Sequence, residues 1–395
     1  MKLDLPRVRR SLKQHDIAAW VLADFRNRDP FSRRILGLPD TLHCTRRWYY
    51  VIPAIGAPIK IVSAVEPHLL DDLSGSTCLY RTWQDLVGVL RKVLGRSRQH
   101  IAMQYSPKNR IPYLSTVDAG TVELFRSLGH EVVSSSVLLH QALSYIGPTG
   151  YRSHKTAARL VDQIRRSAFA KIETALEMGK RITELEVQQF IMRRFAAEGL
   201  VTADPPMVGV NEHPADPHFE VSKTQPAIIR KGDTILIDLW AKLRSVNSIY
   251  YDITWVGYAG SKPPPQYQKI WAIVRDARDA AIEFVLNRAR RSLPCTGAAV
   301  DDVARRVIER AGFGRYFVHR TGHNITTSTH GEGTNIDNFE TADDRLLLPG
   351  SCFSIEPGIY LPRKMAVRSE VNMFIHDDGA AEVTGEIQRD LVLLG

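Results

Sequence analysis

Four acidic residues lie in segments that are otherwise apolar, and they share one spacing. The segment 350–374 (GSCFSIEPGIYLPRKMAVRSEVNMF) contains Glu356 and Glu370, and the segments KGDTILIDLW and SIYYDITWVG contain Asp238 and Asp252. In each pair the two acids are 14 residues apart, and each Asp precedes its Glu counterpart by 118 residues. Burying a carboxylate among Ile, Val, Phe and Met is costly unless a cation or hydrogen bonds compensate the charge. The pattern therefore predicts a metal or a basic partner at these positions.

We interpret the two pairs as copies of one hairpin, each of which contributes two acids to a common centre. Gly232 and Gly350 keep the same offset as the acids. Acidic residues in strands can coincide by chance, but a single offset shared by four of them disfavours coincidence. Arg368 precedes Glu370 by two residues, so both lie on the same face if the segment is a strand. Arg368 can orient one carboxylate, but a single cation does not account for both acids of the hairpin.

Histidine residues lie close to both hairpins in the sequence. Three occur in HRTGHNITTSTHGEG and a fourth in NEHPADPHFE, namely His319, His323, His330 and His218. A histidine in a loop is usually structural or solvated. His323 differs because a glycine precedes it and a polar, Thr-rich run follows, a composition that allows backbone and ring to approach a site closely. On chemistry alone, a ligand role and a structural role for His323 remain equally open.

Each hairpin follows a pair of predicted helices. The apolar spacing predicts helices over 155–178, 183–198, 266–287 and 298–311. Thr183 and Glu186 form the capping-box pattern at the start of the second helix. The unit of helix, helix and hairpin therefore occurs twice, in agreement with the 118-residue offset. A repeat of this size predicts a duplication with a pseudo-twofold axis, because a solenoid would need a shorter period and more copies.

The first part of the chain has a different pattern. Helix-like segments (5–14, 83–94 and 119–128) alternate with strand-like segments (18–23, 48–54, 59–65, 100–104 and 131–135). This alternation predicts a layered α/β domain. No glycine-rich phosphate loop follows any of these strands, so nucleotide binding is not indicated. The Gly- and Pro-containing stretch 146–150 (IGPTG) predicts the boundary between the two parts.

Composition is that of an ordinary globular protein. The chain has 395 residues, 44% of them hydrophobic and 24% charged. No apolar run reaches the roughly 18 residues that a membrane helix needs, and the N-terminus lacks the apolar core of a signal peptide, so we expect a cytoplasmic protein without a membrane contact. The four cysteines form no CxxC pair, which argues against a disulfide framework or a zinc knuckle.

The net charge of +9 is unevenly distributed. Residues 1–150 contain 20 Lys and Arg against 12 Asp and Glu, whereas the remainder contains 32 against 31. The basic residues of the first part are scattered pairs without interleaved aromatic residues, which is not typical of a nucleic-acid surface. A solvated surface or a subunit contact is the favoured interpretation, and we expect no nucleic-acid partner.

The acids and histidines together resemble a known family. The set Asp238, Asp252, His323, Glu356 and Glu370 resembles the metal ligands of the pita-bread metallopeptidases, which include Xaa-Pro dipeptidase (prolidase), aminopeptidase P, methionine aminopeptidase and the metal-free relative creatinase. RTGH at 320–323, SIEPG at 354–358 and VRSE at 367–370 are similar to motifs of this family, in the same order. The resemblance implies an α+β protein, with a smaller α/β creatinase-like domain at 1–147 and a catalytic pita-bread domain with a pseudo-twofold repeat of helix pairs at 148–395.

The resemblance also implies roles for the acids. Asp238 would chelate one metal ion, Asp252 and Glu370 would bridge two, and His323 and Glu356 would complete the shell around the first. Creatinase-like members lose acidic ligands, whereas all five ligands are present here, which favours a metal-dependent enzyme. Four carboxylates and one imidazole suit Mn²⁺, Fe²⁺ or Co²⁺, with Zn²⁺ as a further candidate, and Mn²⁺ is our first expectation. Two such ions lower the pKa of a bound water toward about 7.

The remaining site residues take supporting roles by the same resemblance. Glu356 would be the general base that later protonates the leaving nitrogen. His218 and His330 match two histidines that contact the substrate carbonyl and stabilise the tetrahedral intermediate, and His319 matches a further pocket histidine. Arg368 would hold Glu370 ionised and oriented. The implied activity is hydrolysis of a peptide bond, of the Xaa-Pro dipeptidase or aminopeptidase type, by a protein that forms a homodimer.

Three departures from the family pattern predict a divergent branch. The Asp-to-Asp spacing of 14 is longer than usual and predicts a longer hairpin turn around Arg244 to Ser248. Val371 stands where an acid is usual, and Asn324 where a glycine is common. The substrate is therefore not restricted to an Xaa-Pro peptide. A metallohydrolase or lyase that acts on another small molecule, and a non-catalytic binding protein of the same fold, are the two alternatives.

Overall fold

The chain folds into two compact units. The computed structural model describes residues 3–39 and 41–395, and it divides into Met1–Leu143 and Ser144–Gly395. The domain boundary expected from the sequence, after residue 147, lies four residues beyond this division. Among the described residues, none of the helices combines the length and the apolar character that a membrane span requires.

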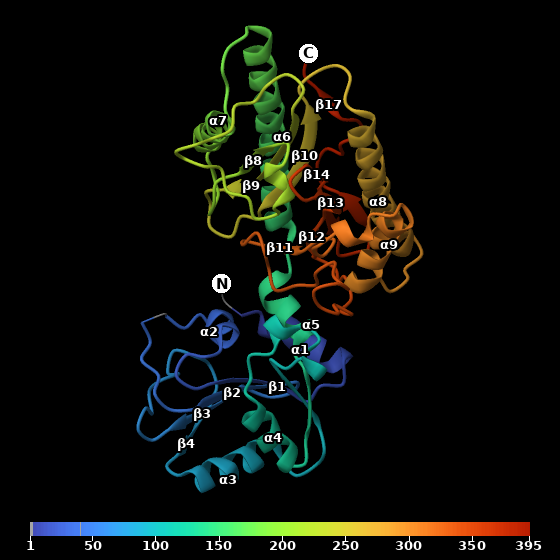
Figure 1. Cartoon of the computed structure of the whole chain (residues 1–395). Helices are drawn as coiled ribbons and strands as arrows, with labels where there is room; N and C mark the ends of the chain where they lie inside the picture. Colours follow the sequence, from blue (N-terminus) through green and yellow to red (C-terminus); the bar gives the residue numbers. More distant parts are fainter. Residues whose placement is uncertain (1–2, 40) are drawn as a thin grey trace. The chain divides into compact units, whose positions relative to one another are not determined.

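The N-terminal unit is built around a six-stranded sheet with the strand order β4-β3-β2-β1-β5-β6 (Figure 1). Two apolar clusters cover its two faces, one with α1 and α2 and the other with α3 and α4. In chain order its elements are α1 (Leu5–Gln14), β1 (Ala19–Asp24), α2 (Pro30–Leu36), β2 (Trp48–Pro53), β3 (Ile59–Ser63), β4 (Ser76–Tyr80), α3 (Trp83–Leu94), β5 (His100–Met103), α4 (Ala119–Ser127), β6 (Glu131–Ser134) and α5 (Ser136–Leu139).

All eight elements predicted for this unit are present, and three further ones, α2, β4 and the four-residue α5, escape the pattern analysis. The α2 helix has only seven residues, too few for a helical period to be recognised, and its start is fixed by an Asp29 cap and a proline. The β4 strand is an edge strand with mostly exposed residues, so it lacks the apolar run that marks a buried strand.

The C-terminal unit consists of two similar halves. The first contains α6 (Pro148–Glu177), α7 (Glu184–Ala197), β7 (Leu200–Val201), β8 (Met207–Val210), β9 (Thr234–Leu243) and β10 (Tyr251–Tyr258). The second contains α8 (Pro265–Arg290), α9 (Gly297–Arg310), β11 (Asn324–Ile325), β12 (Cys352–Ile355), β13 (Gly358–Leu361), β14 (Met365–Arg368), β15 (Val371–Ile375), β16 (Ala381–Val383) and β17 (Val392–Leu393).

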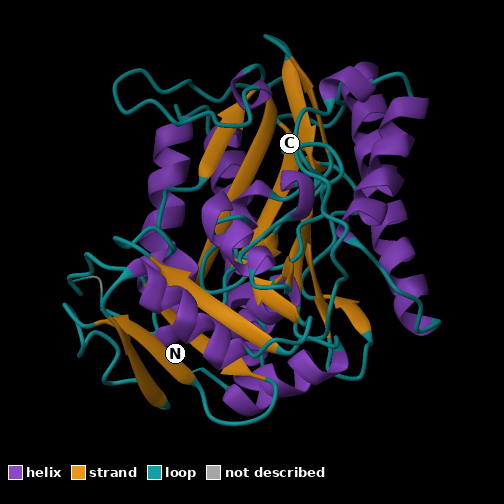
Figure 2. Cartoon of the chain, turned by 90° about the horizontal axis from the view of Figure 1, so that it is seen from below, coloured by secondary structure: helices purple, strands orange, loops and turns teal. Residues whose placement is uncertain are grey.

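The predicted repeat of helix, helix and hairpin is confirmed. The capping box of Thr183 and Glu186 opens α7. The helices α6 and α7 pack against β9 and β10 in one core cluster, and α8 and α9 pack against β12, β13, β14 and β15 in another. The two helix pairs lie on opposite sides of the strands (Figures 1 and 2). Each half thus buries one apolar strand face under its own helices.

A buried histidine ties α6 to the strands and gives the fold a pH dependence. His154 is fully buried, and its Nδ1 donates to the Tyr250 carbonyl at 2.6 Å while its Nε2 accepts from the Thr384 hydroxyl at 2.7 Å. Burial lowers the pKa of His154 to about 4. The unfolded chain therefore binds a proton that the folded chain rejects between pH 6.5 and 4, and stability is lost as the pH falls through this window.

We expect this histidine to lower the free energy of unfolding by about 3 kcal/mol between pH 7 and pH 4. Urea denaturation over this range gives the free energy of unfolding against pH for the wild type and for His154→Gln. The difference between these two curves measures the effect of His154, because the contributions of the other titrating groups cancel. The variant should be less stable at pH 7 and should lose less on acidification. Parallel curves would show that His154 does not titrate on unfolding.

Candidate metal centre

The first two acids lie on neighbouring strands and share a face. In the antiparallel pair of β9 and β10, Asp238 stands opposite Thr254, and Asp252 opposite Trp240. The alternate residues Ile237 and Ile253 point into the core under α6 and α7. Because side chains alternate along a strand, both acids point to the other face, away from those helices. The connection between the strands spans 244–250, which includes the turn expected around Arg244 to Ser248.

The sequence predicts that the second pair of acids lies within two facing strands. In the structure these acids lie just beyond a strand pair. Ile355 of β12 stands opposite Val371 of β15, so Glu356 and Glu370 occupy the next opposed positions. The small hairpin β13–β14 is inserted between them. The backbone N–H of Glu370 donates to the Thr254 carbonyl at 3.1 Å. This bond joins the two halves of the unit at the point where their acids meet.

His323 reaches the same place because the chain beside it is tightly packed. It precedes β11, and its N–H donates to Ser354 Oγ at 2.9 Å while its carbonyl accepts from the Ser354 N–H at 2.9 Å. A Cβ on Gly322 would lie 2.0 Å from the Ser354 carbonyl oxygen. Only glycine therefore allows this close approach, as the sequence predicts.

The five expected ligands all line one cavity of about 660 Å³. Asp252, His323 and Glu370 each offer one ligand atom within 4.8 Å of the others. His323 Nε2 lies 3.6 Å from Asp252 Oδ2 and 3.3 Å from Glu356 Oε1. Asp238 joins the group from β9, so residues spread over 238–370 meet in a single cluster.

Charge within this cluster is strongly unbalanced. Burial is the main cause that raises the pKa of Asp238, Asp252 and Glu370, and the neighbouring carboxylates raise the last two further. Burial also lowers the pKa of His323 well below its usual range, so the imidazole is neutral. Within the described ranges, the only cation that forms an ion pair with these carboxylates is Arg368. Four carboxylates and one guanidinium require further positive charge to remain ionised at neutral pH.

Two buried oxygens fit a metal ion. Asp238 Oδ1 and Glu370 Oε1 have no hydrogen-bond partner within the described part of the chain. An unsatisfied buried carboxylate oxygen is costly, and a divalent cation would satisfy it. Carboxylate oxygens and one imidazole are the donor set of a hard or borderline metal such as Mn²⁺. The residues present therefore fit the divalent ions that the sequence predicts.

Arg368 contacts a different carboxylate from the expected one. It forms an ion pair with Asp238, and it donates to the Thr254 hydroxyl at 2.9 Å and to the Tyr360 hydroxyl at 3.2 Å. Thr254 in turn donates to Glu370 Oε2 at 2.8 Å. Arg368 thus reaches Glu370 through a hydroxyl group, because it ends β14 while Glu370 lies beyond it, off the same strand face.

His319 also differs from the expected pocket histidine. It lines the cavity, but its Nδ1 donates to the Arg320 carbonyl at 2.6 Å and its Nε2 accepts from the Tyr360 hydroxyl at 2.7 Å. Burial lowers its pKa to about 4, so it is neutral. Both ring nitrogens are engaged within the protein, which makes His319 a positioning residue for Tyr360.

His218 and His330 both line the cavity, as predicted from the sequence. Both residues are exposed, in contrast to His323. The ring of His330 packs edge-on against His323, with centroids 4.3 Å apart and an interplanar angle of 88°. His218 belongs to the loop between β8 and β9. They are therefore placed where a molecule in the cavity could contact them.

Three residues of the centre escape the sequence analysis. Thr254 and Tyr360 connect Arg368 to Glu370 and His319. Asn372 accepts from the Asp252 N–H at 2.9 Å and donates to its carbonyl at 2.7 Å. Thr254 follows Asp252 by two residues, so a search for polar residues on the same strand face could have found it. Tyr360 and Asn372 carry no comparable signal.

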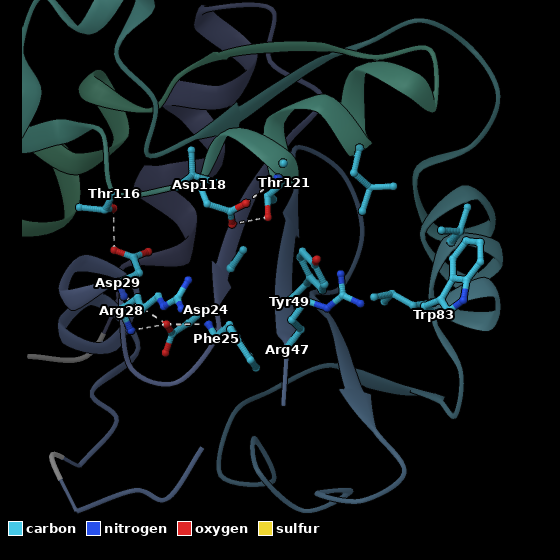
Figure 3. A pocket seen from close by; sticks show the side chains of 16 residues that line it. Asp24, Phe25, Arg28, Asp29, Arg47, Tyr49, Trp83, Thr116, Asp118 and Thr121 are labelled. Carbon is cyan, nitrogen blue, oxygen red and sulfur yellow. Dashed lines mark hydrogen bonds between the residues drawn. The ribbon is translucent and has the colours of Figure 1, made fainter. Parts of the chain in front are cut away.

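A second cavity, of about 440 Å³, belongs to the N-terminal unit (Figure 3). Three carboxylates line it, and each accepts hydrogen bonds from nearby protein groups, although Asp24 Oδ2 has no partner within the described residues. Asp24 accepts three backbone N–H groups, Asp29 accepts from Thr116, and Asp118 caps α4 through Thr121. Figure 3 shows several of these bonds as dashed lines. The acids of this cavity therefore serve the local backbone and do not form a second metal cluster.

The chain matches one family of known proteins, and two of its relatives are named as dipeptidases. Residues 152–377 match the metallopeptidase family M24. A Mycobacterium tuberculosis protein named probable dipeptidase PepE is 28% identical over 338 residues, which cover 84% of this chain and 82% of the relative. The Xaa-Pro dipeptidase of Pyrococcus furiosus is 32% identical over 228 residues, which cover 58% of this chain and 60% of the relative.

Solved structures resemble the chain over its full length. The dipeptidase PepE from Mycobacterium ulcerans has a TM-score of 0.68 at 24% identity, with all of both chains covered. The X-prolyl aminopeptidase from Caenorhabditis elegans, described as a cytosolic enzyme with a di-nuclear active site, has a TM-score of 0.63 at 15% identity and covers 99% of this chain and 65% of its own. The expected fold, with its smaller N-terminal α/β part, is therefore confirmed.

Proposed function

This chain belongs to the metallopeptidase family M24, and we propose that it hydrolyses short peptides. The proposed activity is of the Xaa-Pro dipeptidase or aminopeptidase type and uses two divalent metal ions. The observation that carries the proposal is the meeting of four carboxylates and one imidazole around one cavity. The residues that would hold the ions are Asp238, Asp252, His323, Glu356 and Glu370. Mn²⁺ is the first candidate, with Co²⁺, Fe²⁺ and Zn²⁺ as alternatives.

Glu356 is the group that moves the proton. When bound, the ions supply a water of lowered pKa and a Lewis acid for the substrate carbonyl. The Oε1 atom of Glu356 accepts from Ser354 Oγ at 3.0 Å, which fixes the orientation of the carboxylate. Its Oε2 atom is then available to accept a proton from the attacking water and to pass it to the leaving nitrogen.

The histidines and the arginine support this step. His330 and His218 each offer an N–H to the carbonyl oxygen as negative charge develops on it, and one such donor contributes about 3 kcal/mol. Arg368 opposes the rise in the pKa of Asp238 through their ion pair, and it orients Glu370 through Thr254. His319 holds Tyr360, which accepts a hydrogen bond from Arg368, so this chain of bonds limits the movement of the guanidinium.

A peptide panel with metal analysis tests the proposal. We expect the Mn²⁺-supplemented protein to hold about two ions per chain and to hydrolyse at least one class among Xaa-Pro dipeptides, other dipeptides and tripeptides. Turnover of none of them by a protein with filled sites would assign the centre to another metallohydrolase or lyase reaction. Failure to take up metal would instead favour a non-catalytic binding protein.

We further propose that the protein forms a homodimer. The resemblance that predicts the ligand set also predicts a homodimer, and the basic excess of residues 1–150 provides a candidate contact surface. We also propose a cytoplasmic location.

A further inference from the structure

Arg320 is a second arginine of the metal cavity, and its surroundings differ from those of Arg368. It is half-buried and lines the same 660 Å³ cavity as the five proposed ligands. Across residues 3–39 and 41–395, no hydrogen bond or ion pair is formed by its guanidinium group. Arg368, by contrast, is bonded to Asp238, Thr254 and Tyr360. The guanidinium nitrogens remain accessible to solvent, so their five N–H donors are available to a ligand in the cavity.

Two other arginines near the cavity, Arg305 and Arg345, have protein partners for their guanidinium groups. Arg305 donates to both oxygens of Asp301 at 3.0 and 2.9 Å and to the His319 carbonyl at 2.9 Å. Arg345 donates to Asp343 at 2.8 Å and to the Gly333 carbonyl at 2.7 Å. These two arginines hold the loops around the cavity together. Arg320 has no such structural task.

The backbone of Arg320 is nevertheless held firmly. Its N–H donates to Glu340 Oε1 at 2.9 Å, and its carbonyl accepts from His319 Nδ1 at 2.6 Å. The next residue, Thr321, donates its N–H and hydroxyl to the buried Asp301 at 2.9 and 2.6 Å. The stem of the side chain therefore starts from a fixed backbone position three residues before His323.

Arg320 lies three residues before the proposed ligand His323, and both line the cavity. Its positive charge is one of the causes, after burial and the neighbouring His330, that lower the pKa of His323. A guanidinium group presents a planar fork of N–H donors that matches a carboxylate and binds it in a bidentate way. A peptide carries such a carboxylate at its C-terminus, and in a dipeptide this group lies one residue from the scissile bond.

On the basis of the proposed function, we infer that Arg320 recognises a carboxylate group of the substrate and so selects anionic short peptides. The α-carboxylate of a dipeptide and an acidic side chain offer the same chemistry. If the α-carboxylate is the group bound, the enzyme prefers dipeptides to longer or amidated peptides, since the carboxylate of a longer peptide lies further from the scissile bond. Arg320 is thus a specificity residue and takes no part in proton transfer.

Binding of dipeptide analogues tests this inference without turnover. In these analogues the scissile amide is reduced to CH₂–NH, and they are compared as the free acid, the C-terminal amide, and an amide with Glu in the second position. Titration calorimetry with the Mn²⁺-supplemented wild type should show the acid binding about tenfold to a hundredfold more tightly than the amide. A preference for the Glu-containing amide would identify the side-chain carboxylate as the source.

Variants assign that preference to one residue. Arg320→Gln should abolish the difference between acid and amide while leaving amide binding near the wild-type value, and Arg320→Lys should retain part of it, because lysine keeps the charge but not the fork. Lys223→Gln removes an exposed cation of the same cavity and serves as the matched control. The inference is overturned if Arg320→Gln keeps the preference for the acid, or if it weakens binding of the acid and of the amide equally. It is also overturned if Lys223→Gln is the variant that loses the preference for the acid.

The hydrolysis assay separates this inference from the proposed function. Free-acid and amidated dipeptides are given to the same three variants and to the wild type. We expect Arg320→Gln to raise the KM of the free acid about tenfold or more with little change in kcat. Absence of turnover together with Arg320-dependent binding of the acid analogue would refute the peptidase and leave the carboxylate site in place. Turnover without an Arg320-dependent preference would refute the carboxylate site alone.

Discussion

Glu356→Gln is expected to lower kcat by about 10²- to 10⁴-fold at saturating Mn²⁺. Glutamine preserves the size of the side chain and can still accept a hydrogen bond from Ser354, but it cannot take a proton from water. Glu356 is half-buried, whereas the other three acids are buried, and it lines the cavity. The measurement is steady-state hydrolysis of a dipeptide found active in the panel, with metal content determined on the same sample.

Glu220→Gln provides the matched control for this variant. Glu220 lines the same cavity and is exposed, and it forms no part of the proposed centre. The same charge is removed in both variants, so a general electrostatic effect would lower both rates. Retention of the wild-type rate by Glu356→Gln, with its metal content unchanged, would show that another group accepts the proton.

Asp252→Asn is expected to have opposite effects on function and on stability. It should abolish hydrolysis and lower the Mn²⁺ content, because it removes one of the carboxylates that would hold the metal ions. In the metal-free protein the same change should raise the free energy of unfolding by about 1 to 4 kcal/mol, because it removes one of several buried, mutually repelling charges. Chelator-treated wild type and variant are compared by urea denaturation at pH 7.

The physical reason is visible in the direction of the pKa shifts. Burial raises the pKa of Asp252 and Glu370 well above their usual values, so the folded metal-free protein binds more protons than the unfolded chain. These acids therefore raise the free energy of unfolding below about pH 4, near their unfolded pKa. This stabilisation is lost as the pH rises toward their folded pKa. Asp252→Asn should reduce this loss. This is opposite in sign to the effect of His154.

Asp301→Asn is the control for this reversal. Asp301 is as deeply buried, but it accepts hydrogen bonds from Arg305 and Thr321 and balances the charge of Arg305. Its replacement should destabilise the protein, because it leaves that guanidinium without its counter-charge. If Asp252→Asn destabilises the metal-free protein to the same degree, the four carboxylates are compensated within the chain and the case for the metal ions weakens.

Much of the local structure could be predicted from the sequence, because it depends on neighbours along the chain. The capping pattern of Thr183 and Glu186 fixes the start of α7, and the residues of α1 and α3 coincide with the predicted segments. The shared offset of 118 residues predicted two copies of one unit. The helix pairs and the β9–β10 hairpin follow from it. Short or exposed elements such as α2 and β4 were missed, since their formation depends on caps and edge pairing.

For the centre, the sequence by itself determined which residue types meet, and tertiary structure decided how their atoms are paired. Five expected ligands line one cavity; the spacing predicted that the four acids meet, and the family resemblance added His323. Only the folded chain shows that Arg368 binds Asp238, 130 residues away, and that Thr254 connects Arg368 to Glu370, 116 residues further along the chain. It also shows that, within residues 3–39 and 41–395, the Arg320 guanidinium has no protein partner. Strand periodicity selects the face on which a side chain lies. The partner of each polar atom depends on how two hairpins pack together, and no pattern within one hairpin contains that information.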